Sequence, residues 1–373
     1  MKTRRMIFLM VLAVFVMAAC EKDDTKNLIP EEEGSLTTVK FEMDANAFGH
    51  NGITRAIVPV YTNAGFSIFA FRKADDGSDY RCNQVIYGST MDYNVTTGKL
   101  TGSARLPIGT YRFLPAYGLV SPLNVEMPDM TNAELSDMLG VTHKNTGSVP
   151  EIFLATGTSN TLPSYVLGTT SAENPTISAS LKRAVARVDV LFLKATKTGD
   201  IYKEEPYADG EDVFGGKELD TVQLRFTSLN DKMSLLGSRI GTGTLDADIN
   251  IPRLTDAVVK GEGTATVIGT PDFTRYDAIG KGDIIKGSAH LAGPYVFPGN
   301  DDTKNTGLEI YIKPKNSIGR TITIDTKLPL ERNKVTLVKV YVLEGNVFTT
   351  KVTFEVIIDT AWNGSHEVSG EVD

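Results

Sequence analysis

Few side chains in this sequence can act as nucleophiles, metal ligands or proton carriers, since its 373 residues include only two cysteines and four histidines. A thiol can accept an acyl chain or bind a metal, and an imidazole can exchange a proton near neutral pH. The histidines are far apart in turn-like sequence, at His50, His143, His290 and His366. We therefore expect each histidine to be a solvated surface residue, and we expect no metal and no cofactor.

Motifs of common catalytic sites are absent from the sequence, including the Gly-x-Ser-x-Gly elbow, His-Glu-x-x-His, the phosphate loop and the EF-hand. Carboxylates are abundant, but their spacing does not tell whether two of them face each other as in a glycosidase. We expect Cys82 to be packed as a small apolar residue of a strand. The chain is not expected to be an enzyme, and a surface glycosidase is kept as a third hypothesis.

Cys20 stands where an apolar segment ends. Basic residues occur among the first five, residues 6–17 are apolar without interruption, and two alanines come directly before Cys20. This arrangement is typical of a secretory signal peptide, and a helix of about a dozen residues is too short for the roughly 30 Å hydrocarbon layer. Residues 17–20, Met-Ala-Ala-Cys, resemble the lipobox of bacterial lipoproteins. We expect residues 1–19 to be a signal peptide and Cys20 to be lipidated, for example with palmitate; an ordinary cleaved signal is the alternative.

Residues 20–35 are acidic and lack aromatic side chains, so we expect them to form a disordered tether. Within them, residues 22–24, Lys-Asp-Asp, resemble the tag that sends some lipoproteins of Gram-negative anaerobes to the outer face of the outer membrane. The formal net charge is −8, and no run of lysine and arginine is longer than two. Nucleic acid is therefore not expected as a partner.

Apolar and polar residues alternate along many segments, which indicates antiparallel strands with one buried and one solvated face. The clearest segments are 39–43, 308–312, 322–324, 336–342 and 352–358. Residues 65–73 and 109–118 predict strands that are buried more completely. One short helix is predicted at residues 131–140, because Thr131 and Glu134 match a capping box and Gly140 matches a helix end. The predicted fold class is all-β, with antiparallel β-sandwiches and one or two short helices.

The length of the chain predicts two domains, because one hydrophobic core rarely serves more than about 300 residues. Residues 176–193 are predicted to form one long strand that ends the first sandwich and begins the second. We place the boundary at residue 182, with an N-terminal sandwich at 36–182 and a C-terminal sandwich at 183–373.

Several segments, in this order and spacing, resemble the fimbrillins, the lipoprotein-derived pilin subunits of Gram-negative anaerobes. Besides the lipobox, the similar segments are LTTVKFEMDA at 36–45, GITRAIVP at 52–59, LKRAVARVDVLF at 181–192, LERNKVTLVKVYV at 330–342 and DTAWNGSHEVSGEV at 359–372. The resemblance implies two transthyretin-like β-sandwich domains. It also implies a structural role in a fimbria of the cell surface that contributes to cell adhesion.

The resemblance further implies a route of assembly. The precursor reaches the outer membrane as a lipoprotein, held there by its lipid, and an Arg-specific surface protease then cuts it. The matching bond here follows Arg55 and leaves Ala56 as the new N-terminus. The cut would release the first strand, 36–45, with Val39, Phe41 and Met43. A donor strand of the next subunit would fill the groove in a head-to-tail polymer. The matching candidate donor residues are Val352, Phe354, Val356, Ile358, Val368 and Val372.

Other roles stay open at this stage. The chain is a stalk subunit if it both loses its first strand and donates another, and a tip or accessory adhesin if it donates none. It is an anchor subunit if it keeps its lipid and Arg55 is not cut. It is a surface lipoprotein that binds glycan or host protein if it does not polymerise. The surface ligand of such an adhesin is not identified by the sequence.

Overall fold

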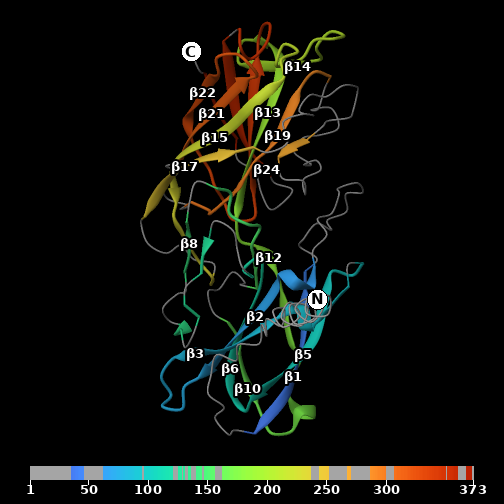
Figure 1. Ribbon diagram of the computed structural model, residues 1–373, viewed down its shortest axis with the longest axis vertical. Helices are drawn as coiled ribbons and strands as arrows, with labels where there is room; N and C mark the ends of the chain where they lie inside the picture. Colours follow the sequence, from blue (N-terminus) through green and yellow to red (C-terminus); the bar gives the residue numbers. More distant parts are fainter. Residues whose placement is uncertain are drawn as a thin grey trace, which may run out of the picture. The chain divides into compact units, whose positions relative to one another are not determined.

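The computed structural model (Figure 1) is almost entirely β-structure, and residues Ser35–Asp373 form one compact unit. It describes residues 35–45, 62–94, 96–120, 125–127, 129–130, 133–135, 140–144, 147–155, 162–236, 243–251, 267–269, 286–299, 306–349, 351–359 and 367–371.

Most strands that precede residue 184 build two sheets. Sheet A has the strand order β11-β1-β5-β4, and sheet B has the order β12-β9-β6-β2-β3, with β10 beside β6. In sheet A the bounds are β1 Leu36–Asp44, β4 Asp92–Asn94, β5 Lys99–Pro107 and β11 Ile177–Ser180. In sheet B they are β2 Phe66–Lys73, β3 Tyr80–Tyr87, β6 Gly109–Tyr117, β9 Phe153–Leu154, β10 Ser164–Leu167 and β12 Lys182–Arg183. Side chains of both sheets, among them Phe41 and Phe113, form one buried cluster, the N-terminal core.

Most strands after residue 184 build two further sheets. Sheet D has the order β18-β19-β13-β23-β24-β25, with β14 and β20 also beside β13, and sheet E has the order β17-β15-β21-β22. In sheet D the bounds are β13 Ala186–Thr198, β14 Ile201–Glu205, β18 Val267–Gly269, β19 Ala289–Ala292, β20 Tyr295–Val296, β23 Val335–Val342, β24 Val352–Asp359 and β25 Glu367–Glu371. In sheet E they are β15 Leu219–Asn230, β17 Thr244–Asn250, β21 Thr306–Pro314 and β22 Arg320–Leu328. Side chains of both sheets, among them Val338 and Leu224, form the C-terminal core.

A third buried cluster, the middle core, connects the two halves of the chain. It contains Phe71 of β2 together with Leu337 and Tyr341 of β23. It also contains residues of a small sheet C, in which β16 (Lys232–Ser234) and β7 (Val125–Glu126) flank β8 (Gly140–His143). The same cluster therefore takes side chains from strands before and after residue 184.

The all-β fold class is confirmed, and so are the more completely buried strands β2 and β6. The expectation of one solvated face is wrong for residues 336–342, because all residues of β23 are buried. The strand pairs in parallel with β13 and has a core on each face, which is typical of parallel strands. Alternation alone does not distinguish a solvated face from a face covered by another part of the chain.

The long strand predicted at 176–193 is wrong. The chain there forms β11, β12 and the start of β13, which belong to sheets A, B and D. The pairing therefore changes from sheet B to sheet D between Arg183 and Ala186. The division into two domains at residue 182 stays a prediction.

Of residues 131–140, where a short helix was predicted, the structure describes 133–135 and 140, and Leu135 lies in a 3₁₀ turn. Glu134 forms an isolated β-bridge and an ion pair of 2.7 Å with Arg81, and Gly140 begins strand β8. Thr131 lies outside the described residues, so the capping box stays a prediction. The short helices that the structure describes are 3₁₀ turns, η2 Asn63–Gly65, η3 Gly88–Thr90 and η5 Ser171–Glu173.

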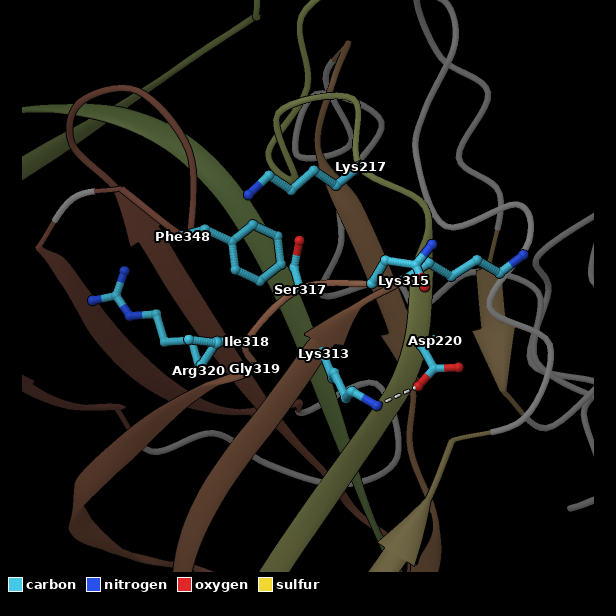
Figure 2. A pocket seen from close by; sticks show the side chains of 10 residues that line it. Lys217, Asp220, Lys313, Lys315, Ser317, Ile318, Gly319, Arg320 and Phe348 are labelled. Carbon is cyan, nitrogen blue, oxygen red and sulfur yellow. Dashed lines mark hydrogen bonds and ion pairs between the residues drawn. The ribbon is translucent and has the colours of Figure 1, made fainter.

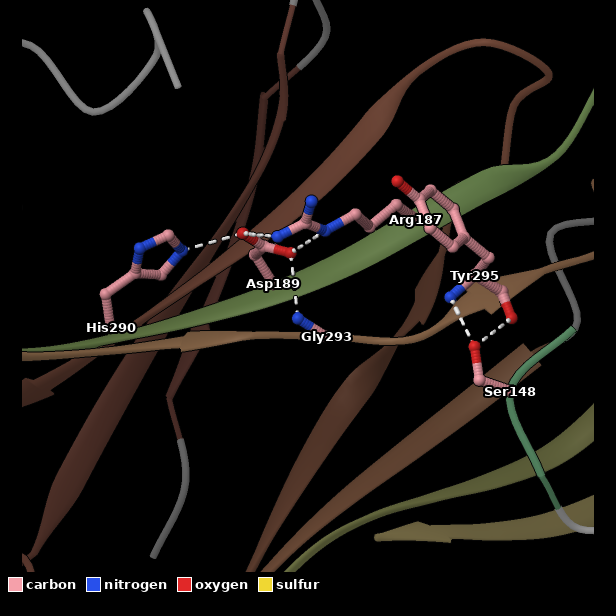
Figure 3. A network of polar contacts seen from close by, with 6 residues as sticks. All are labelled: Ser148, Arg187, Asp189, His290, Gly293 and Tyr295. Carbon is pink, nitrogen blue, oxygen red and sulfur yellow. Dashed lines mark hydrogen bonds and ion pairs between the residues drawn. The ribbon is translucent and has the colours of Figure 1, made fainter. Parts of the chain in front are cut away.

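A charged network lies fully buried in sheet D (Figure 3). Asp189 of β13 accepts hydrogen bonds from Arg187 Nε at 2.7 Å, from His290 Nε2 at 2.7 Å and from the backbone N–H of Gly293 at 3.0 Å. A Cβ at Gly293 would lie 1.4 Å from the carbonyl oxygen of Val188, so only glycine allows this approach. Burial by itself raises the pKa of Asp189, but the Arg187 charge and the hydrogen bonds outweigh it and hold the pKa below its usual value.

Two histidines correct the expectation that all four are solvated. His290 is fully buried in this network, and His143 of β8 is 6 % exposed. The ring of His143 lies 6.0 Å from that of Phe297, and its Nε2 lies 2.6 Å from the carbonyl oxygen of Gly147. Since a carbonyl only accepts, Nε2 carries the proton. His50 and His366 lie outside the described residues.

Candidate assembly site: the first strand and its groove

Strand β1 lies inside sheet A rather than at its edge. It pairs antiparallel with β5 along its whole length, from Leu36 opposite Pro107 to Asp44 opposite Lys99. On its other side Phe41–Asp44 pairs in parallel with Ile177–Ser180 of β11. Both neighbours therefore donate and accept backbone hydrogen bonds that only a strand in this position can satisfy.

The inward side chains of β1 are sealed in the N-terminal core. Val39 and Met43 are fully buried and Phe41 is 2 % exposed, so the predicted first-strand residues all point the same way. The ring of Phe41 meets that of Phe113 edge to face, with centroids 5.4 Å apart. Removing β1 would therefore leave a hydrophobic groove lined by strands of both sheets.

The loop around η5 holds the half of β1 that β11 does not reach. Asn174 Nδ2 donates to Thr37 Oγ1 at 2.7 Å and to the Thr38 carbonyl at 3.1 Å, and Ser171 Oγ accepts from the Thr38 N–H at 3.0 Å. These side chains replace a neighbouring strand along this edge. No sequence pattern identifies these two residues, because more than 130 residues separate them from β1.

On the solvated face of sheet A, Lys99 Nζ of β5 lies 2.5 Å from Glu42 of β1. The hydrogen bond and the charge of Glu42 raise the pKa of Lys99. Exposed pairs of this kind contribute little to stability, so the apolar side chains and the backbone bonds hold β1 in place.

A hollow of about 270 Å³ already lies beside this region. It is lined by residues of β6, β10 and β11, including Phe113, Tyr165 and Ile177. Phe113 and Ile177 also belong to the N-terminal core that β1 fills. Loss of β1 would therefore open the core next to an existing hollow.

The candidate donor residues are part of the chain's own sheet D. Val352, Phe354 and Val356 of β24 are buried in the C-terminal core, and β24 lies between β23 and β25. Ile358 is in β24 and Val368 is in β25, opposite Val356. β25 is the last strand of the sheet order, so it can leave without dismantling the core around β24.

Several predicted positions lie outside the described residues, namely Cys20, Arg55, Ala56 and Val372. Cys82 is described, and it is the small buried strand residue that was expected. Burial raises its pKa to about 12, so the thiol is not reactive at neutral pH.

Within the described ranges no three side chains of His, Cys, Asp and Glu are grouped as a metal site requires. The same ranges contain no helix with the length and apolarity needed to cross a membrane.

Fold and site together define an all-β protein whose first strand is enclosed between two later strands. No family model and no curated protein matches the chain. Similar solved structures include the tip fimbrial protein Mfa3 from Porphyromonas gingivalis, at 11% identity and a TM-score of 0.35, covering 87% of this chain and 99% of that one.

Two other similar structures come from other bacteria. A fimbrial assembly protein from Parabacteroides distasonis has 10% identity and a TM-score of 0.38, with 89% of this chain and 99% of that one covered. A candidate polysaccharide-binding protein from Bacteroides thetaiotaomicron has 14% identity and a TM-score of 0.43, with 90% and 98% covered. At these identities and TM-scores the three structures assign neither a family nor a function to the chain.

Proposed function

We propose that the chain is a structural subunit of a cell-surface fimbria, exported as a lipoprotein through Cys20 and assembled by strand exchange after cleavage at Arg55. The observation that supports this most is the position of β1, which is buried and paired on both edges. Its sequence link to β2 contains Arg55. A cut there separates β1 from β2 and from every later strand that the structure describes.

An incoming strand must match what β1 leaves. It has to run antiparallel to β5 and parallel to β11, and it has to supply apolar side chains at alternate positions. A contact of this kind between identical chains is heterologous and does not close, so it builds a filament. The lipid holds the precursor at the outer membrane until the protease acts.

Arg-specific protease is expected to yield a product that begins at Ala56 and forms SDS-resistant ladders.

A double variant, Lys40→Cys with Ser103→Cys, tests whether β1 has to leave. These two exposed residues lie opposite each other on β1 and β5, so a disulfide between the new cysteines would lock β1 in place. Opposed antiparallel residues are about 4.5–5.5 Å apart at Cα, within the range of a disulfide. Locked protein should be cut but assemble only after reduction. Normal assembly by Arg55→Ala, or by the locked form, would refute the proposal.

A tip or accessory subunit is the second candidate, and the C-terminal strands favour it. β24 is fixed in the C-terminal core, and Val368 is the only apolar residue within Glu367–Glu371 of β25. Such a strand fills the pockets of Val39, Phe41 and Met43 poorly. If cut protein accepts a synthetic peptide of residues 36–45 but forms no ladders, the accepting role holds and the donating role fails.

A further inference from the structure

A solvent-open hollow of about 1070 Å³ lies at the end of sheet E, far in the sequence from β1 (Figure 2). Its floor and walls come from three places in the chain, namely residues 217–220, the turn from β21 into β22, and Phe348. None of the residues that line the hollow belongs to the N-terminal core that β1 fills. It is therefore a second candidate site with its own chemistry.

Positive charge gathers in this hollow. Its lining includes Lys217, Lys313, Lys315 and Arg320 against the single carboxylate of Asp220. Lys313 pairs with Asp220 at 2.9 Å and Lys315 pairs with Glu218. Lys217 therefore adds a positive charge that no carboxylate of the lining pairs with, in a chain whose net charge is −8. The hollow would therefore attract an anionic ligand, although the molecule as a whole is negatively charged.

Lys217 is the cation most open to a ligand. Its Nζ lies 5.0 Å from the centre of the Phe348 ring, and among the described residues it has no carboxylate partner. The ring keeps the ammonium group over the hollow without neutralising it. Arg320, by comparison, donates to the carbonyl oxygen of Val347, and burial lowers its pKa.

The turn at residues 315–319 is held in one shape. The N–H of Lys315 donates to the Glu218 carbonyl at 2.8 Å, and Asn316 adopts a positive φ of 55°. A Cβ at Gly319 would lie 2.6 Å from the hydroxyl oxygen of Tyr311, so a larger residue here would displace the Tyr311 ring. Ile318, at the exposed end of this turn, is 94 % accessible. A preformed turn lowers the entropy lost when a ligand binds.

We propose that this hollow binds an anionic saccharide, a sugar chain that has carboxylate or sulfate groups. The lysines meet the anionic groups, whereas Asp220 and the side chains of Asn316 and Ser317 offer the acceptors and donors that sugar hydroxyls need. Ile318 gives an apolar contact for the C–H face of a sugar ring. An acidic peptide also has carboxylates for the lysines, but it lacks the series of hydroxyls that Asp220, Asn316 and Ser317 can bind.

Binding is tested with the uncut full-length chain, so that the result does not depend on strand exchange. The probes are oligogalacturonate, dextran sulfate, neutral dextran and polyglutamate, each titrated at low and at high salt. We expect binding of one or both anionic saccharides that weakens with salt, and none of neutral dextran. Lys217→Glu should weaken binding about tenfold or more, the scale of one lost charge-assisted hydrogen bond.

Matched variants separate the alternatives. Lys203→Glu makes the same charge change on exposed β14, and it should leave affinity unchanged. Ile318→Ser should weaken saccharide binding with an unchanged unfolding temperature. If polyglutamate binds as tightly as the saccharides and Ile318→Ser has no effect, the ligand is an acidic peptide and the proposal is wrong. Equal weakening by Lys203→Glu, or no binding of any anionic probe, also overturns it.

Discussion

His143 is a single side chain whose surroundings make the protein sensitive to pH. Burial lowers its pKa, and the hydrogen bond to Gly147 raises it by a smaller amount. The folded protein therefore prefers the neutral imidazole, whereas the unfolded chain takes up a proton near pH 6.5. This preference adds stability above the unfolded pKa, and the added stability is lost as the pH falls below it.

We expect the free energy of unfolding to fall between about pH 7.5 and pH 5.5, with part of this slope due to His143. His143→Gln keeps a donor for the Gly147 carbonyl but has no proton to gain, so its slope should be smaller. Urea titrations of both proteins at the two pH values measure the difference. Equal slopes would show that His143 does not titrate on unfolding.

At the scale of one element, β1 is held by different means along its two halves. Its second half has strands on both sides, whereas its first half depends on β5 and on the side chains of Ser171 and Asn174. The first half is therefore where release of the strand begins, because two side chains are easier to displace than a strand.

Asn174→Ala removes the donor to Thr37 and Thr38, and a typical hydrogen bond contributes about 0.5–1.5 kcal/mol. We expect faster native-state hydrogen exchange of the β1 amides, with the amides of β13 unaffected. Asn94→Ala is the matched control, since Asn94 accepts from Thr96 and Thr97 in an exposed turn away from this edge. Acceleration of β13 as well would mean global destabilisation rather than local release.

The elements differ in how well the sequence predicts them. The alternation of Val39, Phe41 and Met43 was sufficient to predict β1 and its buried face, because burial of alternate residues is a local property of a strand. The loop at Ser171, the burial of His290 and the second core on β23 depend on residues that are distant in the sequence. No local pattern in the sequence records these three features.

For the whole molecule, the middle core is what couples the two halves of the chain. Leu337 faces this core, whereas Leu224 lies in the C-terminal core. Both side chains are buried to 1% or less accessibility. Truncation of either leucine leaves a cavity. Only truncation of Leu337 weakens contacts between strands before and after residue 184.

Leu337→Ala and Leu224→Ala should each lower the free energy of unfolding by about 2–5 kcal/mol. We expect Leu337→Ala also to lower the denaturant m-value, because the two halves then unfold in separate steps. Leu224→Ala should keep the m-value of the unchanged protein. Urea unfolding followed by far-UV circular dichroism gives both quantities. Identical m-values for the two variants would contradict coupling through the middle core.

The parallel pairing of β1 with β11 sets the order in which the chain can fold. β1 is made before its neighbours in sheet A, yet Phe41 has to wait for Ile177, which follows 136 positions later. Contacts this distant form late, since closing long loops is slow. Within sheet A, the earliest strand is thus among the last to be fully paired, and the newly made chain spends time with its groove open.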